Sequence, residues 1–258
     1  VTQVLAEDFN SMVTFNVDVS TISGFDHATE FIYIAGDFPG ATWNEPGTNP
    51  NLLLSRVGVT DIYTITLDLP DGAYQYKYFR NATWNFGEWT GGSNRNIAVS
   101  GNTVTEDVFG GDITWANIQW PAGGTVAEGG TFNVYGQAYI PNGITWAAGA
   151  TYGLEVSVGI SSTDTDPSGW TTWVPATFNS QSGDNDEFMA DIATGLTPGT
   201  YYYAFRYRFG QTYGEYLYGG FNGGFWNGST NLSGVLTVTP AVVDKYLDVT
   251  VYLEGPFN

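Results

Sequence analysis

The feature that most constrains the fold is a two-residue alternation of apolar and polar side chains that recurs along the whole chain. Residues 13–20 (VTFNVDVS) and 61–70 (DIYTITLDLP) show it in the first half, and residues 130–140 (GTFNVYGQAYI) and 200–209 (TYYYAFRYRF) show it in the second. This period places alternate side chains on opposite faces of a strand. Clusters of Gly, Pro, Asn and Asp separate these segments at a spacing typical of sandwich strands. No segment shows helical periodicity, so we expect an all-β protein.

The chain is long enough for two domains. It has 258 residues, and each half can bury a core of its own. We place the boundary in the segment FGGDITW, which predicts two tandem β-sandwich (Ig-like) domains over residues 1–112 and 113–240. Residues 241–258 contain a further alternating stretch, KYLDVTVYLEGPFN. We interpret it as a terminal strand or the start of a truncated further module. Alternatively, it is an exposed strand that pairs with another subunit.

Composition excludes several classes of partner. Acidic residues outnumber basic residues 26 to 7, giving a formal charge of −19. A nucleic-acid partner is disfavoured, because neutralising phosphates requires many Lys and Arg side chains. Membrane insertion is not expected either, since no apolar run approaches the ~18 residues that a spanning helix needs. The chain has no cysteine, which excludes disulfides and thiol catalysis. An acidic protein of this kind suits a secreted or cell-surface location and leaves room for calcium.

Three segments of the first half follow one another in a characteristic order. They are IYIAGDFPGATW (residues 32–43), YTITLDLPDGAYQYKYF (residues 63–79) and WTGGSNRNIAV (residues 89–99). In this order and spacing they resemble the opening loop, the strand pair and the Trp followed by Asn-Arg of the starch-binding carbohydrate module family 20 and its relatives. The resemblance covers about residues 11–110. It implies a small β-sandwich that binds polysaccharide.

The same resemblance implies a sugar site. By position, Trp43 and Trp89 would form a stacking platform, while Lys77 and Asn94 would hydrogen-bond sugar hydroxyls. The chemistry is consistent with this role, because an indole offers a flat apolar face to the C–H groups of a sugar ring. A structural interpretation stays open for each residue: both tryptophans can belong to the core, and Lys77 can lie on the solvent face of a strand.

Two features depart from the family pattern. The opening loop carries an extra stretch, NEPGTNPN, at residues 44–51, and the following hairpin adds Trp84 and Phe86. Burial of these two aromatics within their own module is difficult, because they lie at a hairpin tip. We therefore expect them to extend the glycan site, or to contact the second module or a partner.

The second half resembles an Ig-like β-sandwich module of secreted and surface proteins of Bacteroidetes-type bacteria. The resemblance is carried by residues 159–179, 183–192, 196–210 and 218–238. Two acidic clusters, STDTDPSGW and GDNDE, lie in this half, and closely spaced carboxylates can hold a calcium ion. The alternative is that these side chains cap turns through hydrogen bonds to the backbone. The candidate calcium ligands are Asp164, Asp166, Asp184 and Asp186.

No catalytic constellation is recognisable. The single histidine, His27, stands in a polar turn, and a serine triad would need a histidine placed beside a nucleophile. We therefore expect no enzymatic activity. The leading interpretation is a non-catalytic pair of modules from an exported bacterial protein that binds an α-glucan or related polysaccharide. The alternative is a structural subunit of a cell-surface assembly, such as an adhesin, surface layer or filament, joined to other copies by strand addition.

Overall fold

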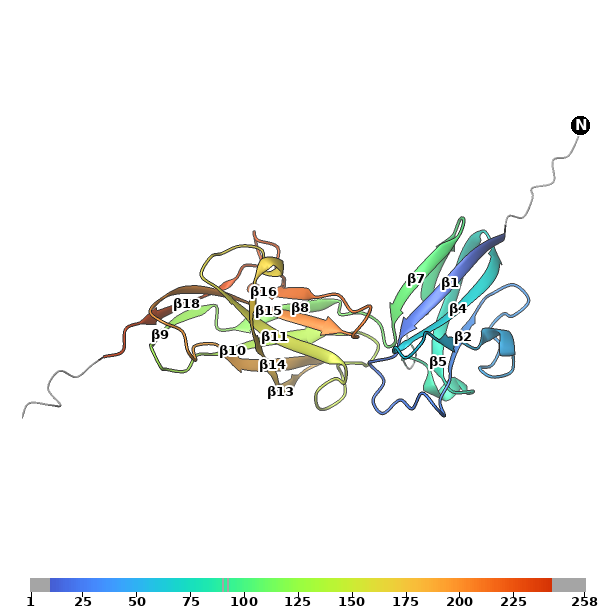
Figure 1. Cartoon of the computed structure of the whole chain (residues 1–258), viewed down its shortest axis with the longest axis horizontal. Coiled ribbons are helices and arrows are strands. Elements are labelled where there is room, and N and C mark those ends of the chain that lie inside the picture. Colours follow the sequence, from blue (N-terminus) through green and yellow to red (C-terminus); the bar gives the residue numbers. More distant parts are fainter. Residues whose placement is uncertain (1–9, 90, 92, 243–258) are drawn as a thin grey trace, which may run out of the picture.

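The computed structural model describes residues 10–89, 91 and 93–242, and these residues form an all-β protein (Figure 1). Apart from three single-turn 3-10 helices, every regular element of this described part is a strand. The predicted fold class is therefore confirmed. The predicted terminal strand, KYLDVTVYLEGPFN at residues 245–258, lies outside the described residues, so pairing through that segment stays a prediction.

The first module contains seven strands in two sheets. One sheet has the order β3-β4-β1-β7 and the other β2-β5-β6. Their bounds are β1 (Asn10–Asp18), β2 (Ile32–Gly36), β3 (Ser55–Arg56), β4 (Ile62–Pro70), β5 (Gly72–Arg80), β6 (Arg95–Val99) and β7 (Thr103–Val108), with the 3-10 turns η1 (Pro50–Leu52) and η2 (Trp84–Phe86).

The alternation in the first module builds its core as expected. Val13, Phe15 and Val17 of β1 are fully buried, and the ring of Phe15 packs edge-on against Tyr76 of β5 with their centroids 4.9 Å apart. Tyr78 of β5 is also fully buried. The two sheets therefore meet through aromatic side chains, which supply large apolar area with few rotatable bonds.

The second module contains eleven hydrogen-bonded strands. Their bounds are β8 (Trp115–Trp120), β9 (Gly123–Ala127), β10 (Asn133–Tyr139), β11 (Leu154–Ser161), β12 (Thr172–Pro175), β13 (Thr177–Ser182), β14 (Asn185–Asp191), β15 (Gly199–Phe209), β16 (Leu217–Gly220), β17 (Gly224–Phe225) and β18 (Gly234–Thr239), with the 3-10 turn η3 (Pro167–Gly169).

These strands follow the order β12-β11-β15-β16-β8-β10-β14-β13, with β17, β18 and β9 attached beside that path. The hydrogen-bonded strands fold into two layers, in which β10 packs face to face on β15. A side chain at Gly136 would collide with the rings of Phe205 and Tyr207. Phe205 and Tyr207 are themselves fully buried. Glycine at this position thus lets the two layers approach closely over the aromatic core.

Both modules contain parallel strands; besides the two ladders below, β16 and β8 share a single parallel pair, Gly220–Asn117. In the first module β1 runs parallel to β7 through six residue pairs, from Val13–Thr103 to Asp18–Val108. In the second, β18 runs parallel to β9 through five pairs, from Val235–Gly123 to Thr239–Ala127. Sequence periodicity alone does not reveal these pairings.

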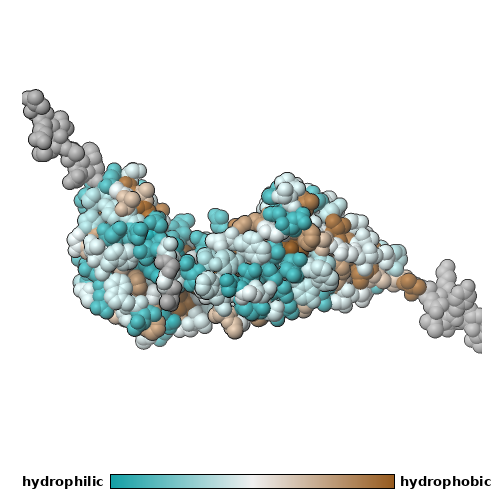
Figure 2. All heavy atoms as spheres, turned by 180° about the vertical axis from the view of Figure 1, so that it is seen from behind, coloured by the Kyte–Doolittle hydropathy of each residue, from teal (hydrophilic) through white to brown (hydrophobic). Residues whose placement is uncertain are grey.

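The segment that follows β1 contacts both the link between β7 and β8 and the loop after β15. The hydroxyl of Thr21 donates to the carbonyl of Phe109, at 2.6 Å, and the Ser20 hydroxyl accepts the backbone amide of Gln211, at 2.9 Å. Figure 2 shows the two lobes from behind, with hydrophobic spheres dispersed among hydrophilic ones on this face. The lobes are therefore connected by hydrogen bonds as well as by the chain.

Candidate functional site

The outer face of the β2-β5-β6 sheet carries the residues that the sequence singled out. In β5 the side chains of Tyr74, Tyr76 and Tyr78 are buried in the core. Because successive side chains of a strand point to opposite faces, Lys77 and Phe79 lie on the outer face. Two segments border this face, the loop of residues 41–51 and the hairpin of residues 81–89.

The two bordering segments touch each other. A side chain at Gly47 would collide with Ala82, and Gly47 has a φ of 89°, so glycine is needed there on both counts. The inserted stretch of residues 44–51 thus packs on the hairpin. Each segment is also ordered locally: the Asn49 side chain accepts the amide of Asn51 at η1, and the Thr83 hydroxyl accepts the amide of Asn85 at η2.

Trp84 and Phe86 are exposed aromatic residues at the tip of the hairpin. Their exposed fractions are 42% and 56%. The ring of Trp84 rests edge-on against Phe79, with centroids 5.1 Å apart, and this contact fixes the indole on the sheet. The hairpin tip therefore presents two aromatic side chains to solvent on an ordered turn.

Lys77 and Trp89 are brought together, but both are buried. Each is only 8% exposed, and the Lys77 ammonium lies 5.0 Å from the centre of the Trp89 ring. The Arg95 guanidinium lies 5.2 Å from the same ring, so two cations already contact the indole. Burial lowers the pKa of Lys77, and the nearby Glu88 charge opposes that shift. Lys77 donates to the carbonyl of Gly91 at 3.3 Å.

This burial disfavours the platform role expected of Trp89, which stays a prediction. A stacking platform needs a ring face that a sugar can reach, and the Trp89 ring has little accessible area. The structural interpretation fits better: Trp89 is packed near the junction, with its six-membered ring close to Gly111. The remaining two expected residues are partly accessible. Trp43 is half-buried, with a φ of 45° and its amide bonded to the Gly36 carbonyl at 2.6 Å.

Asn94 directly precedes β6, and its side chain has a protein partner. Its side-chain amide donates to the Gln75 side chain, at 3.0 Å. Among the aromatic contacts of the described residues there is none between the rings of Trp43 and Trp89. Of the four residues carried over from the family, the structure therefore brings together only Lys77 and Trp89.

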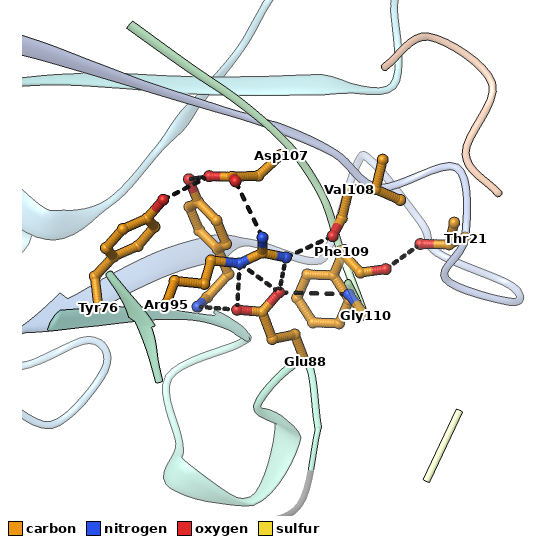
Figure 3. Close-up of polar contacts among 9 residues, drawn as sticks. Thr21, Tyr76, Glu88, Arg95, Asp107, Val108, Phe109 and Gly110 are labelled. Atoms are coloured by element: carbon orange, nitrogen blue, oxygen red, sulfur yellow. Dashed lines mark hydrogen bonds and ion pairs between the residues drawn. The ribbon is translucent and has the colours of Figure 1, made fainter. Parts of the chain in front are cut away.

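A buried ionic network lies beneath the hairpin, and sequence reasoning did not identify it (Figure 3). Glu88 is fully buried and accepts from the Arg95 guanidinium, with a shortest contact of 2.6 Å. Arg95 also pairs with Asp107 at 3.0 Å, and Asp107 in turn accepts the hydroxyls of Tyr76 and Tyr78. Burial raises the pKa of Glu88, and the Arg95 charge opposes that rise.

The network also reaches the junction. Arg95 donates to the carbonyl of Val108 at 2.7 Å, and Glu88 accepts the amide of Gly110 at 3.4 Å. It therefore ties the hairpin of residues 81–89 to the segment that leads into the second module. The only sequence signal was the Asn-Arg pair after Trp89, which the family resemblance included without assigning Arg95 a partner.

The four aspartates proposed as calcium ligands do not form one cluster. Asp166 caps η3 by accepting the amide of Ser168 at 2.9 Å, as the turn-capping alternative expects. Asp186 is fully buried and accepts the amide of Thr151 at 2.8 Å, whereas Asp164 and Asp184 are exposed. Within the described part of the chain, no group of three or more His, Asp or Glu side chains is placed to hold a metal ion.

Comparison with known proteins identifies no family. No protein-family model matches the chain, and no curated protein matches it. Among solved structures, the chain is similar to the family 20 carbohydrate-binding module of a maltotetraose-forming amylase from Pseudomonas saccharophila. The identity is 18% over 38% of this chain and 99% of that module, with a TM-score of 0.27.

Two other solved structures illustrate the range of likenesses. A family 15 glucoamylase from Hypocrea jecorina is 19% identical over 39% of this chain, with a TM-score of 0.29, and the match spans only 17% of the glucoamylase. The major pilin subunit of Bacillus cereus is 9% identical over 90% of this chain and 70% of the pilin, with a TM-score of 0.25. At scores this low, the likenesses carry no argument about function. No helix of the described residues is long and apolar enough to cross a membrane.

Proposed function

We propose that this chain is a non-catalytic glycan-binding part of an exported bacterial protein, and that its first module binds an α-glucan or related neutral polysaccharide. The observation that carries the proposal is the pair of exposed aromatic side chains, Trp84 and Phe86, on a capped 3-10 turn. Trp43, which is half-exposed on the bordering loop, is the third aromatic residue of the proposed surface.

The physical basis is the chemistry of a sugar ring. A glucose unit presents one face of C–H groups, which favours contact with a flat indole or phenyl ring. Trp84 is held in place by Phe79, so little side-chain freedom is lost when a sugar binds. Trp89 supports this surface from within the module instead of contacting the sugar.

Such a surface would bind each sugar weakly. Two or three aromatic side chains on an open face bury only part of a ligand, unlike an enclosed pocket. Tight retention on a polysaccharide would then depend on several modules of the same protein binding at once. This arrangement suits an attachment module, whose role is to keep a protein at an insoluble or extended glycan.

The test measures binding of the 258-residue protein to amylose, β-cyclodextrin and a panel of neutral polysaccharides. Affinity electrophoresis and calorimetry are the two methods. The key variant is the double substitution Trp84→Ala/Phe86→Ala, with Trp43→Ala beside it. Trp146→Ala is the matched control, because Trp146 is 52% exposed but belongs to the second module.

We expect wild type and the Trp146 variant to be retarded equally by α-glucan. The double variant should lose at least tenfold in affinity while remaining folded and unfolding cooperatively. Absence of binding to every glycan of the panel would overturn the proposal. Undiminished binding by the double variant would also overturn it, because the sugar would then bind elsewhere.

A further inference from the structure

A second cluster of aromatic and basic side chains lies on the outer face of the second module. Arg206 of β15 is held between two rings there. Its guanidinium carbon is 4.0 Å from the centre of the Trp173 ring and 4.1 Å from the centre of the Tyr216 ring. Contacts this short on two rings define a clamped guanidinium, in which each ring stabilises the cation through its π face.

The strand register explains how the clamp is built. Trp173 of β12 pairs with Gly159 of β11, and Gly159 pairs with Ala204 of β15. Because these two neighbours have almost no side chain, the indole can lie across the strands toward Arg206. A side chain at Gly159 would approach the Trp173 ring to 2.7 Å, so only glycine at this position leaves room for the indole. The Trp173 indole also donates to the carbonyl of Trp170, at 3.0 Å, which fixes its orientation.

The guanidinium is clamped but poorly supplied with acceptors. Its one hydrogen bond is from Nε to the Ser157 hydroxyl, at 3.3 Å. Three other arginines of the described part, Arg80, Arg95 and Arg208, each form an ion pair with a carboxylate, and Arg206 forms none. The two terminal nitrogens of Arg206 have no hydrogen-bond acceptor among the described residues. They are the part of the side chain that forms paired bonds with a planar anion.

A hollow opens beside this group. Its volume is about 390 Å³, within the range of small-ligand sites. The hollow is polar as well as aromatic. Glu155 lines it and is held by Arg208 at 2.6 Å, which leaves carboxylate lone pairs for further donors. The other lining residues that matter here are Ser157, Trp173, Pro175, Arg206 and Tyr216.

We propose that this hollow binds one acidic sugar unit, a uronate, and that Arg206 receives its carboxylate. The two terminal nitrogens of Arg206 donate a pair of hydrogen bonds to the carboxylate oxygens. The rings of Trp173 and Tyr216 keep water from the flanks of this pair, which strengthens it. Glu155 and Ser157 accept from, or donate to, the sugar hydroxyls, and this distinguishes a uronate from a simple carboxylate.

This site goes beyond the proposed function, since it uses no residue of the first module and a different class of sugar. The negative charge of the whole chain disfavours binding of a long polyanion. A short acidic oligosaccharide at a moderate salt concentration is therefore the suitable probe. At 0.15 M salt, screening confines such repulsion to about 8 Å.

The test is calorimetric titration of the 258-residue protein with trigalacturonate at 0.15 M salt. The matched ligand is the same trisaccharide with its carboxylates methyl-esterified. Arg206→Lys keeps the charge but loses the paired geometry, and Arg206→Met removes both. Arg56→Met is the control, because Arg56 lies in the first module and donates only to the backbone carbonyls of Thr60 and Val59.

We expect wild type and the Arg56 variant to bind the acid and to ignore the ester. Affinity should fall at least tenfold in Arg206→Lys and further in Arg206→Met. Equal binding of acid and ester would overturn the proposal, and so would absence of binding or unchanged binding by Arg206→Met. Equal binding of a short peptide through its terminal carboxylate would overturn the assignment to sugar.

Two measurements keep the result interpretable. Thermal unfolding of each variant shows whether the clamp is also needed for folding, and the acid–ester comparison on wild type tests carboxylate recognition without any substitution. The Trp84→Ala/Phe86→Ala variant should bind trigalacturonate normally. Failure of the neutral-glycan proposal would therefore leave this one standing, and the reverse also holds.

Discussion

The side-chain carboxylate of Asp18 accepts the backbone amide of Thr212, at 2.6 Å, although the two residues belong to different modules. The same oxygen accepts the amide of Tyr213 at 3.2 Å, and the other oxygen accepts the amide of Ser20 at 2.9 Å. Asp18 is fully buried at the end of β1. It therefore holds the loop that follows β15 against the first module and restricts the angle between the two lobes.

Replacing Asp18 with Asn should loosen this junction. The substitution removes the charge and turns one acceptor into a donor that faces the amides of the loop. We expect unfolding stability to fall by about 1–3 kcal/mol, as for a buried hydrogen bond to a charged group that is lost. Denaturant unfolding measures the loss, and small-angle X-ray scattering should show a wider spread of lobe orientations. Asp68→Asn, on the exposed surface of β4, is the control, and equal effects of the two substitutions would contradict the role of Asp18.

Arg95→Met should be among the most damaging single changes in the first module. It leaves Glu88, whose side chain has no exposed area, without its cation. Removing one partner of a buried ion pair typically costs about 3–5 kcal/mol. Arg208→Met is the matched change at an accessible pair with Glu155, and there we expect a loss within about 1 kcal/mol. Denaturation midpoints of the two variants measure these losses. Similar midpoints would show that the Glu88 network contributes little to stability.

Trp89→Ala and Trp84→Ala should lower the free energy of unfolding by different amounts. The buried Trp89 side chain fills space near the junction, so its truncation should cost about 3–5 kcal/mol of stability. Trp84 is 42% exposed and contacts Phe79 edge-on, so its loss should cost about 1 kcal/mol. Thermal unfolding measures both. A Trp89→Ala protein as stable as wild type would mean that this indole is free after all, and the expected platform would have to be reconsidered.

Asp186→Asn should change how stability depends on pH. Burial raises the pKa of Asp186 above its ordinary value, and the amide of Thr151 only partly opposes this. Below the unfolded pKa of about 3.9 the carboxyl is neutral in both states and there is no penalty. As pH rises through the unfolded and then the folded pKa, the wild type loses stability, because ionisation is harder in the folded state.

Asparagine cannot ionise, so the stability of Asp186→Asn relative to wild type should increase as pH is raised from about 3 to about 7. Urea unfolding at a series of pH values measures this difference. Asp164→Asn, at an exposed position, is the control. A difference that stays flat with pH, or decreases, would contradict the direction of the Asp186 shift.

Much of the fold could be predicted because it is encoded locally. The alternation in residues 13–20 and 73–79 directly determines which side chains enter the core, and Val13, Phe15, Tyr76 and Tyr78 are buried as that pattern requires. Strand pairing is different. Nothing in the sequence periodicity says that β1 lies beside β7, because that contact joins segments about ninety residues apart through backbone groups that all residues share.

The candidate site was less predictable for a similar reason. Whether Trp89 is open or buried depends on Lys77, Arg95 and Gly111, which approach it only in the folded module. Trp84 and Phe86 could be predicted as exposed because a hairpin tip offers no interior. The Arg206 clamp could not be predicted, because it requires two small residues, Gly159 and Ala204, at one register position on neighbouring strands.

The parallel pairs β1–β7 and β9–β18 have a mechanical consequence. In the first module the chain enters at one end of β1 and leaves at the far end of the adjacent β7 (Figure 1). A pull on the two ends therefore slides these strands along each other and stretches all the hydrogen bonds of the ladder at once, whereas a hairpin would open them one by one. In the second module the last strand, β18, is likewise parallel to an early strand, β9, which follows β8. A chain built this way resists tension that is applied along its length.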